Sequence, residues 1–273
     1  MASINKFEFK SKNSVIKNIN VFVFYVDSKS SKFFYQRKAD IGFKYFNELE
    51  MLVTFCQHIN ENFKNLNIIL CTDKKTFIPN NLVINIIRLN FDQNLPMYSR
   101  NMLMKLYVRS KHFYQNTIFL DWDIILNFDL DEIFENYNFD IGLTRRSDNK
   151  MMPINEGVIF AKYNRKNKVV SFFNKLNSIY VNFASNRILK FVYGNIKQWR
   201  GGQLSLAKII QWKNTQNKLI INENEYLILD TLIYNFTSIN DISENDLRLK
   251  KIVHLKGWVK NYMYEIYKVL NKK

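Results

Sequence analysis

Two carboxylates separated by one residue are the clearest chemical signal in this chain. Asp121 and Asp123 lie within the otherwise apolar stretch 117–126, which predicts a buried strand that carries both acids. Side chains two positions apart on a strand point to the same face, and adjacent buried carboxylates repel each other unless a cation lies between them. Oxygen ligands suit a hard divalent ion such as Mg²⁺ or Mn²⁺, which often carries substrate phosphates. A strand that ends in a polar turn would show the same pattern, so other segments have to decide.

A histidine far downstream gives these acids more weight. His254 ends a short apolar stretch and is followed by Gly257 and Lys260. A single histidine after a strand is more often structural, but the imidazole ring also serves in metal binding and catalysis. Its combination with the acidic strand favours a functional role.

Two further segments place polar side chains at the borders of expected elements. Asn155, Glu156 and Gly157 read as a polar turn directly ahead of an apolar strand, where a glycine permits a bend or the close approach of a ligand. Gln203 lies at the opening of a helix expected within 199–210. Neither segment identifies a reaction by itself.

Apolar runs of strand length alternate with stretches of helical period in the first half of the chain. Strand, helix, strand, strand, helix, strand is the order of an α/β domain with a mostly parallel central sheet flanked by helices. Ligands of such sheets bind beyond the carboxyl ends of the strands, where Asp27, Asp73 and the two aspartates are expected. The expected strands cover residues 20–26, 67–73, 82–89 and 117–126, and the expected helices cover residues 46–63 and 98–113.

The composition fits one large globular domain. The chain has 273 residues, of which 47% are hydrophobic, and its 7 glycines and 3 prolines form no linker. No apolar run reaches the roughly 18 residues that a membrane span requires, and the first residues lack a signal-peptide pattern, so we expect a cytoplasmic protein. Cys56 and Cys71 have no metal-binding spacing and are expected to be reduced core residues.

The formal net charge of +16 raises the question of a nucleic acid partner. The positive residues are scattered along the chain and no nucleic-acid-binding motif accompanies them, so we do not expect one. A basic surface equally suits nucleotide phosphates or anionic lipid headgroups.

The ordered set of these segments resembles the retaining glycosyltransferases of the GT-A fold. The resemblance is to glycosyltransferase family 8, which includes glycogenins and bacterial lipopolysaccharide galactosyl- and glucosyltransferases. That family has a Leu-Tyr-Leu-Asp-x-Asp strand, an Asn-Ala-Gly-Val segment, an Asp-Gln helix start and a His-x-x-Gly-x-x-Lys motif, in this order. The matching positions are residues 118–123, Asn155 to Val158, Gln203, and His254 with Gly257 and Lys260.

The resemblance implies a role for each matched position. A divalent ion, Mn²⁺ or Mg²⁺, would be held by Asp121, Asp123 and His254, with Asp121 also near the donor ribose. The diphosphate of a nucleotide-sugar, most simply a UDP-sugar, would be held by Lys260 and the main chain at Gly257. The other implied positions are Val26 and Asp27 at the nucleotide base, Trp122 in the donor site, Asn155 at the donor sugar and Gln203 at the anomeric carbon.

The implied activity is transfer of a sugar from the nucleotide-sugar to a glycan or lipid-linked acceptor, with retention of the anomeric configuration. The metal ion and the lysine would neutralise the leaving diphosphate and lower the barrier to an oxocarbenium-like transition state. No strong nucleophile is then required.

Departures from the family pattern leave two alternatives open. Where the family has an arginine in the helix before the acidic strand, this chain has Lys105, with Arg100 and Arg109 about one turn away on either side. The resemblance implies that Lys105 and Arg100 help to bind the nucleotide-sugar donor. Gly202 stands where the family has an aspartate before the glutamine, which removes an acceptor for a sugar hydroxyl. A distant GT-A relative that inverts the anomeric centre would use a carboxylate such as Glu156 as general base. A nucleotide-sugar or glycan binding protein without turnover is the other alternative.

The end of the chain carries both aromatic and basic side chains. We expect a catalytic domain over residues 1–262 and a separate helix or tail over residues 263–273. Such a helix could associate peripherally with an anionic membrane surface, or it could pack back on the domain. The sequence leaves both arrangements open.

Overall fold

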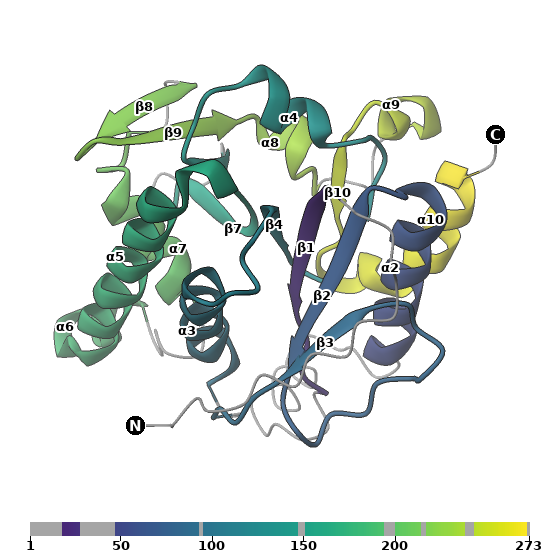
Figure 1. Ribbon diagram of the computed structural model, residues 1–273, viewed down its shortest axis with the longest axis horizontal. Coiled ribbons are helices and arrows are strands. Elements are labelled where there is room, and N and C mark those ends of the chain that lie inside the picture. Colours follow the sequence, from purple (N-terminus) through teal and green to yellow (C-terminus); the bar gives the residue numbers. More distant parts are fainter. Residues whose placement is uncertain are drawn as a thin grey trace. The chain divides into compact units, whose positions relative to one another are not determined.

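The chain forms two compact units, each assembled from separate segments. The first contains Met1–Gln93, Leu120–Leu130 and Leu232–Lys273, and the second contains Asn94–Phe119 and Asp131–Thr231. Both are mixtures of helices and strands (Figure 1). The computed structural model describes residues 18–27, 47–92, 95–146, 151–193, 200–213, 217–237 and 243–271.

Three parallel strands form the sheet of the first unit, in the order β3-β2-β1. All residues of β1 are buried, as the continuous apolar run predicts for a strand covered on both faces. Its one amide, Asn20, accepts a hydrogen bond from Asn67 on β2, whose own oxygen accepts from Asn85 on β3. The strands are β1 (Ile19–Phe24), β2 (Leu66–Thr72) and β3 (Asn85–Arg88), and a separate antiparallel pair joins β5 (Ile124–Leu126) to β10 (Ile252–His254).

Helix α2 (Glu48–Asn62) begins where its sequence places a cap. The side chain of Asn47 accepts a hydrogen bond from the main-chain N–H of Glu50, and Glu48 and Glu50 add negative charge to the first turn. Its apolar face is buried, so the helix expected over 46–63 is confirmed within two residues at either end. The other helices of this unit are α9 (Glu244–Arg248), the 3-10 helix η3 (Gly257–Tyr262) and α10 (Met263–Asn271), and α8 (Thr231–Tyr234) begins at its border.

The C-terminal helix α10 packs back on α2 (Figure 1). The hydroxyl of Tyr267 donates to the carboxylate of Glu61, and the amide of Asn271 lies 3.4 Å from Nδ1 of His58. Arg248 on α9 donates to the main-chain oxygen of Leu270 at 3.0 Å. These contacts correspond to the packed alternative, and they give no support to a membrane-docked helix. None of the helices in the described ranges is both long and apolar enough to cross a bilayer.

The sheet of the second unit is mixed. Strand β6 pairs with β9 in parallel and with β7 antiparallel, and β8 forms an antiparallel hairpin with β9. At the hairpin turn, Asn222 and Glu223 both have positive φ, which is the geometry of a two-residue turn between twisted strands. The order is β4-β7-β6-β9-β8, with β4 (Asn116–Leu120), β6 (Ile141–Arg145), β7 (Ile154–Ala161), β8 (Lys218–Ile221) and β9 (Asn224–Leu229).

Helix α5 is the centre of the helical part of the second unit. It packs against α3 on one side and α7 on another, and α6 continues from its end (Figure 1). Within α5, Phe172, Phe173 and Tyr180 are almost fully buried. The helices are α3 (Pro96–Arg109), α4 (Asp131–Asn136), the 3-10 helix η2 (Tyr163–Arg165), α5 (Lys166–Ser185), α6 (Arg187–Tyr193) and α7 (Gly201–Ile209).

Two local expectations are wrong. The stretch 117–126 is not one strand, because β4 ends at Leu120 and β5 begins at Ile124, and the aspartates lie in the bend between them. The chain has to turn there because β4 and β5 belong to different sheets. Asn155 and Glu156 do not form a turn either, because they are buried residues within β7.

Candidate metal centre and a second buried polar cluster

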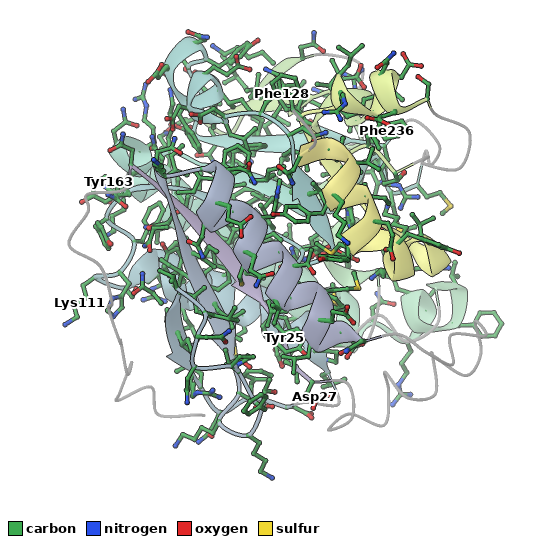
Figure 2. The ribbon with its side chains drawn as sticks, turned by 90° about the vertical axis from the view of Figure 1, so that its right-hand side faces the viewer. Tyr25, Asp27, Lys111, Phe128, Tyr163 and Phe236 are labelled. Carbon is green, nitrogen blue, oxygen red and sulfur yellow. The ribbon has the colours of Figure 1, made fainter. Side chains whose placement is uncertain are left out.

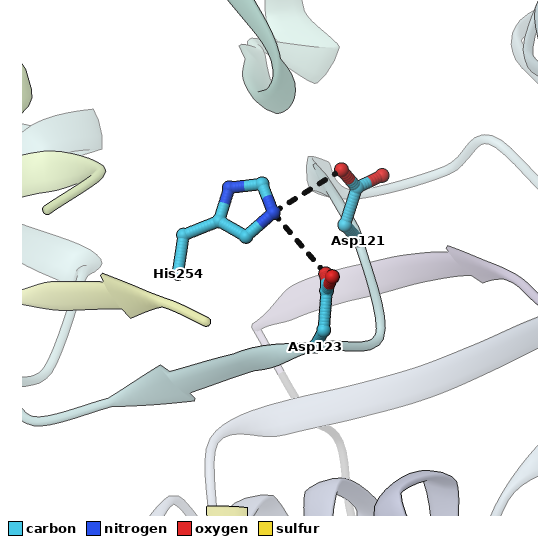
Figure 3. A group of neighbouring side chains, drawn as sticks. All are labelled: Asp121, Asp123 and His254. Atoms are coloured by element: carbon cyan, nitrogen blue, oxygen red, sulfur yellow. Dashed lines mark ion pairs between the residues drawn. The ribbon is translucent and has the colours of Figure 1, made fainter. Parts of the chain in front are cut away.

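Pairing of β5 with β10 brings His254 to the two aspartates. In this antiparallel ladder His254 lies opposite Ile124, which directly follows Asp123. The main-chain N–H of Leu255 donates to the main-chain oxygen of Asp123 at 2.8 Å and extends the pairing by one step. Residues far apart in the sequence therefore meet at the end of a two-stranded ribbon (Figure 3).

The three side chains converge on a small volume. Nε2 of His254 lies 3.2 Å from Oδ1 of Asp123 and 3.6 Å from Oδ2 of Asp121 (Figure 3). One ligand atom from each residue can be chosen so that all lie within 4.8 Å of one another. Asp123 and His254 are buried, and Asp121 is partly exposed. This geometry leaves one side of the group accessible.

The protonation of His254 fits a metal ligand. Its Nδ1 lies 2.9 Å from the amide oxygen of Asn235, and because that oxygen can only accept, Nδ1 carries the proton. In the neutral imidazole that binds a metal, Nε2 then presents a lone pair toward the carboxylates. The buried Oδ1 of Asp123 has no hydrogen-bond partner among the described residues. The lone pairs of these two carboxylates and of Nε2 face one another and repel. A divalent cation between them would remove this repulsion, so the three side chains fit a metal site.

Lys260 supplies a positive charge beside this group. Its ammonium contacts Oδ2 of Asp123 and lies 5.2 Å from the centre of the Trp122 ring. Burial opposes the charged form of Asp123, but the ammonium of Lys260 outweighs it, so the pKa of this carboxyl lies well below its ordinary value. Helix η3 begins at Gly257 and returns the chain so that Lys260 reaches the aspartate. A cation in this place can bind a phosphate oxygen.

The residues that directly follow β1 make defined contacts with other parts of the first unit. Tyr25 and Asp27 follow the strand directly (Figure 2), and the ring of Tyr25 meets the edge of Trp122 with centroids 5.6 Å apart. Val26 is buried, and the main-chain N–H of Asp27 donates to Oγ1 of Thr76 at 3.1 Å. Contact of Val26 and Asp27 with a nucleotide base stays a prediction.

A second cluster of buried polar groups lies in the other unit, around Glu156. The amide of Asn101 donates to Oε1 of Glu156 at 2.6 Å, and Nη1 of Arg100 lies 3.5 Å from the same oxygen. The side chain of Asn155 accepts from the main-chain N–H of Gly157 at 3.0 Å, while its buried Nδ2 has no partner among the described residues. This cluster is rich in donors.

The remaining predicted residues of this unit lie in separate places. Gln203, in the first turn of α7, accepts a hydrogen bond from Nη1 of Arg146 at 3.2 Å through its Oε1. Lys105 on α3 lies 3.5 Å from the amide oxygen of Asn177 on α5 and does not share the contacts that Arg100 makes. Roles for Gln203 and Lys105 in donor binding stay predictions.

Sequence reasoning missed the two asparagines that fix these clusters. Asn235 orients His254, and Asn101 binds Glu156. Neither belongs to a motif, and the chain contains many asparagines. The one sequence signal for Asn101 is that it directly follows Arg100, which is a predicted site residue.

Solved structures of glycosyltransferases resemble this chain. GlyE of Streptococcus pneumoniae TIGR4 has a TM-score of 0.53 at 16% sequence identity, with 94% of this chain and 63% of GlyE covered. The galactosyltransferase LgtC, in complex with donor and acceptor sugar analogues, has a TM-score of 0.50 at 10% identity, with 93% and 97% covered. For the bifunctional glycosyltransferase WbbM the TM-score is 0.50 at 10% identity, with 99% and 52% covered. The expected α/β, GT-A-like fold is thereby confirmed.

The sequence comparisons add no family assignment. No protein-family model matches the chain, and no curated protein sequence matches it. The chain also spans less than two thirds of the length of GlyE, at 63%. Membership of glycosyltransferase family 8 therefore stays a prediction.

Proposed function

We propose that this chain is a metal-dependent glycosyltransferase that moves a sugar from a nucleotide-sugar, most simply a UDP-sugar, to a glycan or lipid-linked acceptor. The observation that carries the proposal is the convergence of Asp121, Asp123 and His254 beside Lys260, in a chain with the fold of glycosyltransferases. Retention of the anomeric configuration is part of the proposal and rests on the motif resemblance. A cytoplasmic location, with peripheral contact to a membrane for a lipid-linked acceptor, suits this activity.

The first unit would bind the nucleotide diphosphate. Asp121, Asp123 and Nε2 of His254 are suited to hold Mn²⁺ or Mg²⁺, since carboxylates favour these ions. When bound, such an ion neutralises negative charge that develops on a leaving diphosphate. Lys260 adds a second positive charge, and its contact with Asp123 keeps the ammonium in place before any phosphate arrives.

Asn155 and Gln203 are the residues that we propose for the sugar. We assign Asn155 to a sugar hydroxyl, because its buried Nδ2 has no partner among the described residues and can donate. We assign Gln203 to the face of the anomeric carbon. In LgtC a glutamine is an active-site residue that one solved structure replaces by glutamate, which supports a role for glutamine in this fold. Glu156 is buried and ion-paired, so its surroundings do not favour a general base for an inverting enzyme.

A thermal-shift screen tests the proposal. Nucleotide-sugars are added one at a time with Mn²⁺, and a ligand that binds only the folded state at 100 times its Kd adds about 2.7 kcal/mol of stability. We expect one donor to raise the melting temperature only when the metal is present. Asp123→Asn should abolish this shift. Asp129→Asn, which changes an exposed acid that binds Asn65, is the matched control and should preserve it.

Turnover then separates the alternatives. Hydrolysis or transfer of the stabilising donor, with the anomer of the product read by NMR, distinguishes retention from inversion. Tight donor binding without turnover on any acceptor would indicate a binding protein. No shift with any nucleotide-sugar in Mn²⁺ or Mg²⁺ would refute the proposal.

A further inference from the structure

Glu156 is held on one side by two successive residues of α3. Only 4% of its surface is exposed, and a buried carboxylate is costly unless it is paired and hydrogen-bonded. Asn101 and Arg100 meet its Oε1 at 2.6 and 3.5 Å, and Nη2 of Arg100 also donates to its main-chain oxygen at 3.0 Å. Both the side chain and the main chain of Glu156 are therefore tied to α3.

On its other side the carboxylate lies against the first turn of α7. A Cβ atom at Gly202 would come within 2.0 Å of Oε2 and 2.1 Å of Oε1 and Cδ of Glu156. A Cβ atom at Gly201 would lie 1.9 Å from Cε2 of Tyr180 on α5. The two glycines let this turn pack directly on β7 and α5, and position 202 has no room for a side chain while Glu156 is present.

The charge of Glu156 suits this position. The N-terminus of a helix carries partial positive charge and unsatisfied N–H groups. The first turn of α7 contains no acid, and its N-cap residue, Arg200, has a φ of 67° and makes no side-chain capping bond. Glu156, which belongs to β7, thus supplies the negative charge that the first turn of α7 lacks.

Gln203 directly follows Gly202, so its place depends on this contact. Its Oε1 also accepts from Arg146 at 3.2 Å, which sets the direction of the amide once the turn is fixed. We propose that Glu156 is a positioning residue for Gln203. Glu156 and Gly202 then form a matched pair: the glycine leaves room for the carboxylate of Glu156, which comes from β7 and supplies negative charge to the first turn of α7. The positioning role rests on the proposed function, whereas the matched pair does not.

A matched pair implies that the carboxylate can be moved from one position to the other. Glu156→Ala empties the space that a side chain at position 202 needs, and Gly202→Asp returns a carboxylate to nearly the same place. We expect each single substitution to lower the melting temperature by roughly 5–10 °C, and the double variant to recover more than half of the loss. Glu223→Gln, an exposed acid of the same unit, is the control and should leave the melting temperature unchanged.

Kinetics then test the positioning role, with Mn²⁺ and UDP-glucose or UDP-galactose as probes and donor hydrolysis as the assay. Glu156→Ala should lower kcat about 10- to 100-fold with little change in KM, because the substitution displaces a group that acts at the anomeric carbon. The double variant should recover kcat. Glu156→Gln keeps the shape of the side chain and serves if Glu156→Ala does not fold; it should lower kcat less.

Three outcomes decide the inference. Losses of melting temperature that simply add in the double variant would overturn the matched pair. An active wild type whose kcat is unchanged in both Glu156 variants would overturn the positioning role. If the wild type hydrolyses neither probe and binds no nucleotide-sugar, the proposed function fails, and the melting-temperature cycle by itself still decides the matched pair.

Discussion

Asp123 in the first unit and Glu156 in the second are both buried carboxylates, with 5% and 4% of their surfaces exposed, yet their surroundings differ. Each contacts one cation, Lys260 or Arg100. The remaining neighbours of Asp123 are a second carboxylate and the imidazole nitrogen that lacks a proton. Glu156 instead receives an amide donor from Asn101.

The difference separates a ligand site from a packing contact. A carboxylate surrounded by donors is satisfied by the protein itself, and its removal leaves those donors buried and unpaired. A carboxylate grouped with other acceptors keeps an oxygen that its protein neighbours leave without a hydrogen bond, as Oδ1 of Asp123 shows among the described residues, and a metal cation can bind there. The first arrangement supports structure, and the second supports binding.

The largest expected effect is on catalysis at Asp123. Asp123→Asn keeps the shape of the side chain but removes a metal ligand and the partner of Lys260, so donor turnover with Mn²⁺ should fall at least about 10³-fold. The free energy of unfolding without metal should change little, because the substitution also relieves repulsion with Asp121. Steady-state kinetics and urea unfolding measure the two effects. A large loss of stability with turnover intact would reverse the assignment of the two regions.

Removal of the cation from each region should have unequal cost. Arg100→Ala leaves Glu156 buried without its positive partner, and we expect the free energy of unfolding to fall by about 3–5 kcal/mol. Lys260→Ala should cost about 1 kcal/mol, because this lysine is 25% exposed and its pairing is partly screened by water. Urea unfolding of both variants is the measurement. Equal losses would show that the two carboxylates are held alike.

His58 provides a third case, because it is buried and its hydrogen-bond partners among the described residues are uncharged. Nε2 of His58 donates to the main-chain oxygen of Leu126 at 2.5 Å, and burial lowers the pKa of His58 to about 4 from its ordinary 6.5. Because the unfolded chain binds this proton first, the contribution of His58 is complete above pH 6.5 and is lost as the pH falls toward 4. The shift corresponds to about 3 kcal/mol.

Unfolding at several pH values tests this expectation. His58→Gln should flatten the pH dependence between 6.5 and 4 relative to the wild type. Asp123 does not interfere, since the lowered pKa of its carboxyl places its titration below this window. A slope that persists in the variant would assign the pH dependence to another group.

A smaller effect than that of Asp123→Asn is expected at the residue that orients the metal ligand. Asn235→Ala removes the acceptor for the Nδ1–H of His254, and loss of such a partner lowers metal affinity about 10- to 100-fold. Titration with Mn²⁺, followed by its electron paramagnetic resonance signal, measures the affinity directly. Asn65→Ala is a suitable control, because Asn65 belongs to the same unit and its amide binds the exposed Asp129. An unchanged affinity in Asn235→Ala would mean that Nε2 is available without this hydrogen bond.

Much of the fold could be predicted from local patterns. The expected helix at 46–63 and the strands at 20–26 and 67–73 are present, because the period of apolar residues reflects which face is buried. Local patterns failed at the Asp121–Asp123 bend and at Asn155 and Glu156 in β7. At the bend the distant strand β10 pairs with β5, and in β7 Asn155 pairs with Thr144 of β6, so strand pairing decides the conformation at both places.

The sequence by itself determined which chemical groups are available and their order along the chain: the paired aspartates, the histidine with its lysine, and the glycine before Gln203. Tertiary structure decided what surrounds each of them. The β5–β10 ladder brings His254 to Asp123, Asn235 selects the nitrogen that the histidine presents, and Glu156 fills the space beside Gly202. Residue type fixes what a side chain can donate or accept, whereas distance and burial arise from contacts between distant segments, and these determine whether a carboxylate binds a cation or holds a helix.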